Sequence, residues 1–254
     1  MKYLIGKKQN IELFVEKNYE AMSQKAAALL VDSLANKLQE KQFVTFMPSA
    51  GGTPERLYQI LGEKYKTFVD WSRVIVLQMD EYVDLPAFDK NSYTWFLHKK
   101  LVKPLSIQKA FFIGEYAQGR VQQYDEIIRN LGGIDIILHG IGENGHLGFN
   151  EPESDYDSTT RIVALAPETI HANARFFSNM ETVPTRGITI GLRTIMQAGE
   201  NILIASGVKK LPALTRALFA PVSVNLPASI LQNHPHVKVI ADEDAVDIKL
   251  LKAK

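Results

Sequence analysis

A pair of carboxylates in the segment 79–86 (MDEYVDLP) is suited to proton abstraction. Asp80 and Glu81 directly follow the apolar run 73–78, so they stand at the mouth of a predicted strand, and either could supply a general base. Acidic residues in such a place are more often loop residues or helix caps. The segment by itself leaves a catalytic and a structural interpretation open.

A histidine and a glutamate in a glycine-dense segment offer further acid–base chemistry. Four glycines in the first nine residues of 140–152 (GIGENGHLGFNEP) predict an irregular loop with close backbone approaches. His146 is the histidine best placed for proton transfer near neutral pH, and Glu151 could orient it and stabilise its charged form. A buried histidine is usually structural, which is our interpretation of His139 and His234. For His146, the glycines and the carboxylate favour function.

The segment 48–54 (PSAGGTP) has the features of an anion-binding turn. Gly51 and Gly52 let the backbone approach a ligand, and Thr53 can cap the following helix and offer its hydroxyl. The N–H groups at the start of that helix would attract a phosphate. The segment is neither a Walker A loop nor a GxGxxG turn. A plain tight turn that ends a strand fits these residues equally well.

Alternating apolar runs and amphipathic segments must position these three segments. Strands are predicted at residues 43–47, 73–78, 110–113, 134–139, 187–191, 201–206 and 237–241, and helices at 19–40, 54–65, 92–101, 118–131, 210–219 and 244–251. We therefore predict an α/β fold, in which a single domain over residues 1–254 forms a doubly wound, mostly parallel, Rossmann-like sheet with helices on both faces. Ligands of such sheets bind beyond the carboxyl ends of the strands, where all three segments fall.

The composition excludes several classes of protein. The 254 residues include 29 Lys plus Arg and 28 Asp plus Glu, a balance that predicts no nucleic-acid partner. Without cysteine, a disulfide framework, a thiolate nucleophile and a sulfur-based zinc site are excluded. No run approaches the roughly 18 apolar residues of a membrane span, and the N-terminus lacks the apolar centre of a signal peptide. We expect a cytoplasmic protein with no membrane partner.

Together these segments resemble the glucosamine-6-phosphate deaminase family, part of a wider group that includes the 6-phosphogluconolactonases. The resemblance covers residues 40–240 in unbroken order, and MDEYVDLP and GIGENGHLGFNEP carry most of it, with further support from residues 173–177 (NARFF). It implies an aldose-to-ketose isomerisation coupled to deamination, which turns glucosamine 6-phosphate into fructose 6-phosphate and ammonia. It also implies that no organic cofactor and no catalytic metal takes part.

The resemblance assigns roles to individual residues. It implies that Asp80 moves a proton from the amine-bearing carbon to its neighbour, and that His146 opens the sugar ring with help from Asn144 and Glu151. The residues implied to hold the substrate phosphate are Gly51, Gly52, Thr53, Arg175 and Lys210. Considered without the resemblance, Arg175 could cover an apolar surface and Lys210 could be an exposed helix residue.

Two positions in these segments depart from the family's pattern. Many members have aspartate where this chain has Asn144, so Glu151 is expected to be the ionised partner of His146. Ala50 stands where threonine or serine is common. One hydroxyl contact to the phosphate is therefore lost, or is supplied by Ser49.

A third departure concerns regulation. Some members are hexamers that N-acetylglucosamine 6-phosphate activates through an arginine and a lysine two residues apart. Arg161 retains the arginine, whereas Val163 replaces the lysine, so we expect no activation. Arg161 could also be merely a solvated residue on a strand edge.

Alternative functions stay open at this point. A galactosamine-6-phosphate deaminase giving tagatose 6-phosphate would share the same loops, and a 6-phosphogluconolactonase or an inactive sugar-phosphate sensor would share the fold. The combination of Asp80, His146 and Glu151 argues against a sensor, because a binding protein needs no base. The expected partner is a small sugar phosphate, and assembly into a homo-oligomer is left open.

Overall fold

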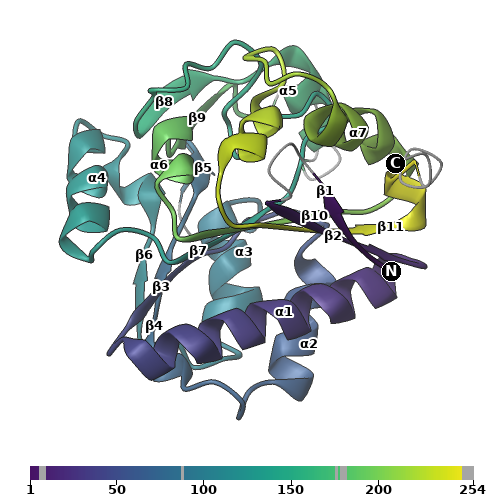
Figure 1. The fold of residues 1–254 in the computed structure, drawn as a ribbon. Coiled ribbons are helices and arrows are strands. Elements are labelled where there is room, and N and C mark those ends of the chain that lie inside the picture. The colour runs from purple at the N-terminus through teal and green to yellow at the C-terminus, as the bar shows by residue number, and fades with distance from the viewer. Residues whose placement is uncertain (6–9, 87–88, 175–176, 178–181, 248–254) are drawn as a thin grey trace.

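An eight-stranded sheet runs through the molecule in the order β1–β2–β11–β10–β7–β3–β4–β6 (Figure 1). The computed structural model describes residues 1–5, 10–86, 89–174, 177 and 182–247. The strands are β1 (Lys2–Ile5), β2 (Ile11–Glu16), β3 (Val44–Met47), β4 (Val74–Leu77), β6 (Lys109–Phe111), β7 (Ile136–His139), β10 (Glu200–Ala205) and β11 (Val237–Asp242). Neighbouring strands are parallel except in the β1–β2 hairpin. The predicted doubly wound, mostly parallel sheet is confirmed.

Helices cover both faces of this sheet (Figure 1). One face carries α1 (Tyr19–Glu40), α2 (Glu55–Lys64) and α3 (Tyr93–Leu97), and the other carries α4 (Val121–Asn130), α6 (Leu192–Met196) and α7 (Leu211–Phe219). The short α5 (Pro167–Asn173) stands beyond the sheet on the second side. The chain continues past α3 as a π-helical turn, His98–Val102, so the predicted helix 92–101 is present with a change of winding.

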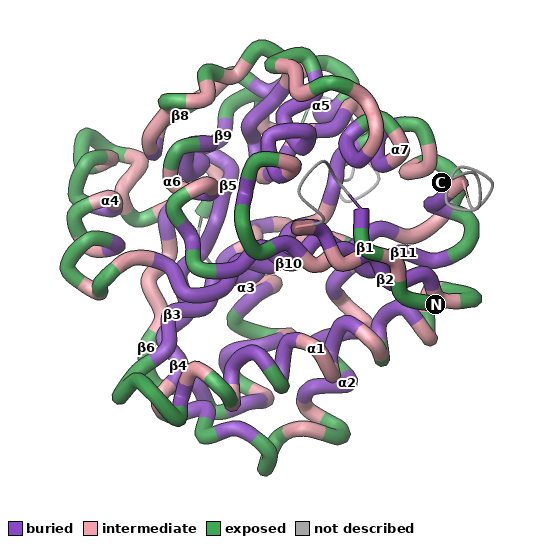
Figure 2. The backbone as a smooth tube through the Cα atoms, viewed as in Figure 1, coloured by how far each residue is buried: buried purple, intermediate pink, exposed green. Residues whose placement is uncertain are grey.

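The strand side chains alternate between two apolar layers. Phe46 packs with the layer under α1 and α2, whereas the next residue, Met47, packs with the layer under α6 and α7. Ile202 and Leu203 of β10 divide in the same way. Side chains alternate between the two faces of a strand, and because both faces are buried here, consecutive residues in the centre of each strand are apolar. Figure 2 shows the result as a buried sheet between helices whose outer sides are exposed.

A smaller antiparallel sheet stands beside the main one. It consists of β5 (Asp80–Tyr82), β9 (Arg186–Thr189) and β8 (Arg161–Ala164), with β9 in the middle. The predicted strand 187–191 therefore exists, but in this second sheet. Strand β5 escaped prediction because its two acidic residues are of a type that strands disfavour.

The C-terminal prediction differs most from the structure. Where a helix was predicted at 244–251, residues Glu243–Ala245 form a short 3₁₀ turn, which the Asp242 side chain caps by accepting from the Ala245 N–H. Residues 248–251 lie outside the described part of the chain. Within that described part, none of the helices is long and apolar enough to cross a membrane.

Candidate active site

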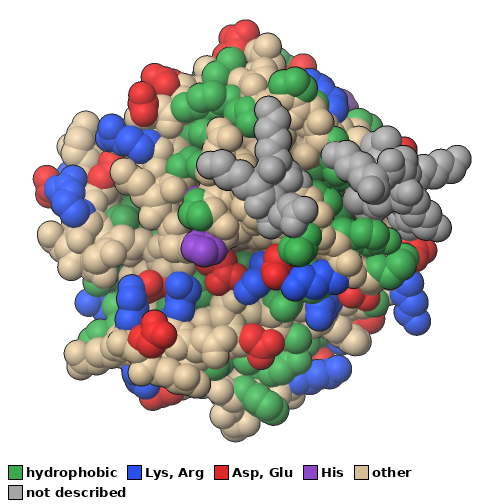
Figure 3. All heavy atoms as spheres, viewed as in Figure 1, with side chains coloured by type: hydrophobic (Ala, Val, Ile, Leu, Met, Phe, Trp, Pro, Cys, Tyr) green, Lys and Arg blue, Asp and Glu red, His purple; other side chains and the backbone are tan. Residues whose placement is uncertain are grey.

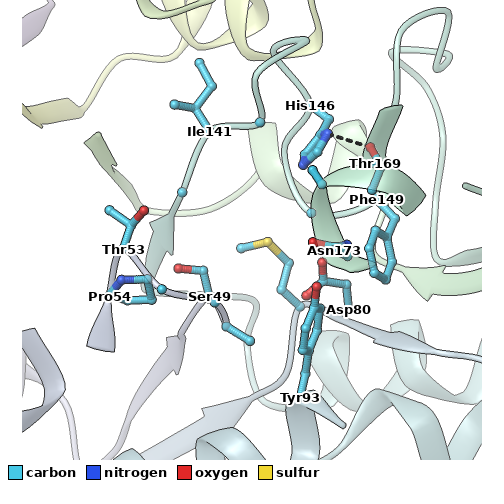
Figure 4. Close-up of a pocket in the computed structure, with 18 of the residues that line it drawn as sticks. Ser49, Thr53, Pro54, Asp80, Tyr93, Ile141, His146, Phe149, Thr169 and Asn173 are labelled. Atoms are coloured by element: carbon cyan, nitrogen blue, oxygen red, sulfur yellow. Dashed lines mark hydrogen bonds between the residues drawn. The ribbon is translucent and has the colours of Figure 1, made fainter. Parts of the chain in front are cut away.

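The three segments singled out in the sequence meet in one cleft beyond the carboxyl ends of β3, β4 and β7 (Figure 4). The loop after β3 contributes Gly51, Gly52 and Thr53, and the segment after β4 contributes Asp80. His146 enters from the loop after β7. Lys210, in the turn before α7, also lines the cleft. Parallel strands bring these loops to a common edge although they are far apart in the sequence.

Asp80 is a buried carboxylate whose backbone is fixed by a strand. It pairs with Thr189 of β9, and it is 7% exposed at the cleft wall. In Figure 4 the carboxylate lies beside the side chains of Tyr93 and Asn173. Burial, with a smaller contribution from the neighbouring Glu81 carboxylate, raises the pKa of Asp80 to about 8. Such a carboxylate is poised to gain and lose a proton near neutral pH.

Glu81 is occupied in holding the start of α3. Its two carboxylate oxygens accept five hydrogen bonds of 2.7–3.0 Å, from the backbone N–H groups of residues 82, 93 and 94, the Thr94 hydroxyl and the Gln78 amide. Negative charge at a helix N-terminus is stabilising. The structure thereby distinguishes the roles of two carboxylates that the sequence could not distinguish, because Asp80 lines the cleft and Glu81 faces away into the protein.

His146 is backed by Glu151 and Asn144. Its Nδ1 lies 3.3 Å from Oε2 of Glu151, and the Asn144 amide donates to the same oxygen at 2.8 Å. The Asn144 carbonyl oxygen accepts from the His146 backbone N–H at 3.2 Å. Burial by itself would raise the pKa of Glu151, but the imidazole and the other donors around it outweigh that effect and lower the pKa to about 2. A permanently ionised carboxylate thus faces the imidazole.

Glycines in the loop after β7 make room for the His146 imidazole and for its neighbours. A Cβ on Gly142 would lie 2.4 Å from the His146 ring, so only glycine allows the ring its position. Gly148 has φ +57°, and a Cβ there would lie 2.9 Å from the hydroxyl of Thr189. That hydroxyl accepts the Phe149 N–H at 3.2 Å, and Thr189 also pairs with Asp80. The small sheet therefore joins the two loops that carry the acid–base groups.

Arg161 fixes the end of the same loop. Its guanidinium donates to the Asn150 side-chain carbonyl at 2.9 Å and to the Ser154 hydroxyl at 3.2 Å. The Asn150 amide in turn donates to two backbone carbonyls at 2.9 Å. Burial lowers the pKa of Arg161, as expected of a charge that has left water. The interpretation of Arg161 as a merely solvated residue is wrong, because it braces the residue next to Glu151.

The loop after β3 leads into the N-terminus of α2 at the other end of the cleft. Gly51 has φ +112°, a conformation that L side chains rarely adopt. The predicted Thr53 cap is wrong, since α2 begins at Glu55 after Pro54. The Glu55 N–H donates to the Gly52 carbonyl at 3.3 Å, and the Arg56 N–H donates to the Tyr19 hydroxyl at 3.2 Å. The positive end of the helix dipole still favours an anion beside this loop. The Ser49 hydroxyl lines the cleft and is buried without a hydrogen-bond partner in the described structure.

The predicted site residues divide into three groups. Six of them line the cleft, namely Gly51, Gly52, Thr53, Asp80, His146 and Lys210. Asn144 and Glu151 lie behind His146 and act on it by contact. Arg175 lies outside the described residues.

Other cleft residues escaped the sequence analysis as site residues. The cleft wall also includes Tyr93, Phe149, Thr169 and Asn173. Phe149 stacks on Tyr93 with ring centroids 5.8 Å apart, and both pack against Tyr82. Phe149 lies within the segment 140–152, and Asn173 begins the segment 173–177 that supports the family resemblance. The described residues contain no group of three or more histidine, aspartate or glutamate side chains that could hold a metal ion.

The charge pattern of the surface gives no sign of a nucleic-acid footprint on the face in view. Figure 3 shows acidic and basic side chains interspersed there, in keeping with the near-zero net charge of the chain.

Comparison with known proteins assigns the family. The family model for glucosamine-6-phosphate isomerases/6-phosphogluconolactonase matches residues 17–240. The chain belongs to this family. It is 43% identical over 243 residues to a glucosamine-6-phosphate deaminase of Shouchella clausii (strain KSM-K16), an alignment that covers 93% of this chain and 97% of that protein. It is 37% identical to glucosamine-6-phosphate deaminase 2 of Bacillus subtilis (strain 168), over 92% of this chain and 96% of that protein.

Solved structures of the glucosamine-6-phosphate isomerase/6-phosphogluconolactonase family agree with this assignment. A monomeric glucosamine-6-phosphate deaminase superposes with a TM-score of 0.86 at 32% identity, over 92% of this chain and 98% of that one. A 6-phosphogluconolactonase from Leishmania guyanensis gives 0.74 at 20% identity, over 92% and 96%. The lactonase likeness shows the shared fold alone.

Proposed function

We propose that this protein hydrolytically deaminates glucosamine 6-phosphate, converting the sugar phosphate and one water into fructose 6-phosphate and ammonia. The observation that carries the proposal is the arrangement of the cleft. The glycine loop before α2 and a lysine stand at one end, and a buried carboxylate and a histidine stand at the other. A sugar with a phosphate on its last carbon and its reacting carbons at the opposite end matches that polarity.

Asp80 is proposed as the proton-transfer base. It takes the proton from C2, the carbon that bears the amine, and returns it to C1, the neighbouring aldehyde carbon, which leaves an alcohol at C1 and an imine at C2. Water adds to this imine and ammonia leaves, which gives the ketone of fructose 6-phosphate. Its raised pKa supports this role, because one group must both accept and release the proton in a single turnover.

His146 is proposed to open the sugar ring. Its Nδ1 contact with Glu151 leaves Nε2 as the nitrogen that can exchange a proton with the ring oxygen. The ionised Glu151 stabilises the imidazolium that forms when the histidine accepts a proton. Asn144 holds Glu151 by its amide, so the aspartate found in many relatives is not needed for this arrangement.

The phosphate is proposed to bind at the loop after β3. Gly51, Gly52 and Thr53 would surround it with backbone donors, and Lys210 would supply a positive charge. Ser49 would replace the hydroxyl that Ala50 lacks, since its own hydroxyl is buried at this place with no partner in the described chain. Arg175 remains a proposed ligand on the strength of the family pattern.

A direct assay tests the proposal. Purified protein is incubated with glucosamine 6-phosphate, galactosamine 6-phosphate and 6-phosphogluconolactone, while ammonia, fructose 6-phosphate and acid release are followed. We expect ammonia and fructose 6-phosphate in equal amounts from the first compound, and the Asp80→Asn variant as a control that lacks them. Ammonia with tagatose 6-phosphate from the second compound, or lactone hydrolysis alone, would replace the proposal with one of its rivals.

A further inference from the structure

Thr169 is buried in the wall of the cleft and contacts the ring of His146. It lies on α5, is 4% exposed, and its hydroxyl oxygen is 3.4 Å from Nδ1 of His146 (Figure 4). The same nitrogen lies 3.3 Å from Oε2 of Glu151. Two oxygens from different elements thus face one ring nitrogen.

The donors and acceptors at this point have a single consistent arrangement. Oε2 of Glu151 can only accept, and it already receives the Asn144 amide. A ring nitrogen that faces this carboxylate at 3.3 Å must carry a proton, and the Thr169 hydroxyl oxygen, 3.4 Å from the same nitrogen, then acts as a second acceptor. An unprotonated Nδ1 would face a carboxylate lone pair, whereas a protonated Nδ1 satisfies both oxygens.

We propose that Thr169 is a positioning residue that holds His146 in its Nδ1-protonated tautomer, with Nε2 left free for the ring oxygen of the substrate. The inference rests on the proposed function of His146 in ring opening and adds the residue that fixes its protonation pattern and orientation. Because α5 also supplies Ala172 and Asn173 to the cleft, the hydroxyl ties the histidine to the helix that forms the substrate wall.

The matched variants are Thr169→Val, which keeps the shape and removes the hydroxyl, and Thr169→Ser, which keeps the hydroxyl. Two substrates separate the steps: glucosamine 6-phosphate, and its 4,5-dideoxy analogue, which lacks both hydroxyls that could close a ring. With glucosamine 6-phosphate we expect Thr169→Val to lower kcat by about tenfold or more, with KM within about twofold. We expect Thr169→Ser to stay within about threefold of wild type. With the 4,5-dideoxy analogue we expect both variants to stay within about threefold.

Other results would overturn the assignment. Wild-type kcat in Thr169→Val, or an equal loss on both substrates, would show that the hydroxyl does not act through ring opening. If the valine variant fails to fold, ¹⁵N NMR of the His146 imidazole in wild type and Thr169→Ala gives the same test: the wild type must show a protonated Nδ1, and the alanine variant must show a mixture of tautomers. Failure of the proposed function itself looks different, since the wild type would then release no ammonia.

Discussion

Asp80 and Glu81 are adjacent carboxylates for which the structure predicts opposite effects of neutralisation. Burial raises the pKa of Asp80 from 3.8 to about 8, so its carboxyl contributes stability that is complete below pH 4 and is lost as the pH rises towards 8. Between the unfolded pKa and pH 7, about 3 pH units, the free energy of unfolding falls by about 1.4 kcal/mol per unit. The loss at pH 7 is therefore about 4 kcal/mol. The substitution Asp80→Asn would avoid this loss, at a penalty of about 1–3 kcal/mol for burying an amide.

The expected result is therefore a variant that is more stable and less active. We predict that Asp80→Asn raises the free energy of unfolding by about 1–3 kcal/mol at pH 7 and leaves it nearly unchanged at pH 5. Turnover should fall by about 10²–10⁴-fold, because an amide accepts no proton. In the wild type, kcat/KM should rise roughly fivefold from pH 7 to pH 8 as the base ionises.

Glu81→Gln provides the matched control. The carboxylate of Glu81 accepts five hydrogen bonds, and a glutamine would turn an NH₂ group towards some of those donors. We expect a destabilisation of about 2–4 kcal/mol. Urea unfolding at pH 5, 6, 7 and 8, together with ammonia release, measures all three proteins. A stability difference between Asp80→Asn and wild type that does not grow with pH, or a variant with normal kcat, would refute the reasoning.

Three further predictions concern the histidine loop and regulation. His146→Gln should lose far more activity on glucosamine 6-phosphate than on its 4,5-dideoxy analogue, which cannot close a ring, and an equal loss would argue against a role in ring opening. Gly142→Ala should lower kcat by about 10²-fold by displacing the ring, with normal far-UV circular dichroism, while Gly62→Ala, whose Cβ would meet its nearest neighbour at 3.8 Å, should keep full activity. Initial rates should follow a hyperbola that N-acetylglucosamine 6-phosphate does not change, because Arg161 is engaged within its own loop and Val163 cannot bind an anion. Sigmoidal curves that this compound makes hyperbolic would contradict that expectation.

Local signals in the sequence were strong enough to predict the main sheet. The centres of runs such as 134–139 and 201–206 are apolar at consecutive positions because both faces of a central strand are buried, and amphipathic helical segments separate these runs. The N-terminal hairpin of β1 and β2 was missed. The small sheet was also missed, because strands as short as β5 are held by pairing with residues about 100 positions away and carry little signal of their own.

The sequence by itself determined which residue types could do chemistry here and the strand ends at which they stand. A carboxylate pair after a strand, a histidine with a carboxylate five residues later, and a glycine pair before a helix are all visible in the letters. These features lie in three loops, and parallel strands must place such loops at one edge. The sequence therefore already implied that the site lies at the carboxyl ends of the parallel strands.

Only the tertiary structure decided which of the candidate side chains face that cleft and which are held by contacts elsewhere. It turned Glu81 inward as an acceptor for α3, placed Arg161 as a brace for Asn150, and brought Thr169 to the histidine. The physical reason is that a side chain's role depends on which donors and acceptors surround it once water is excluded. Those neighbours come from distant parts of the chain, so no local pattern specifies them.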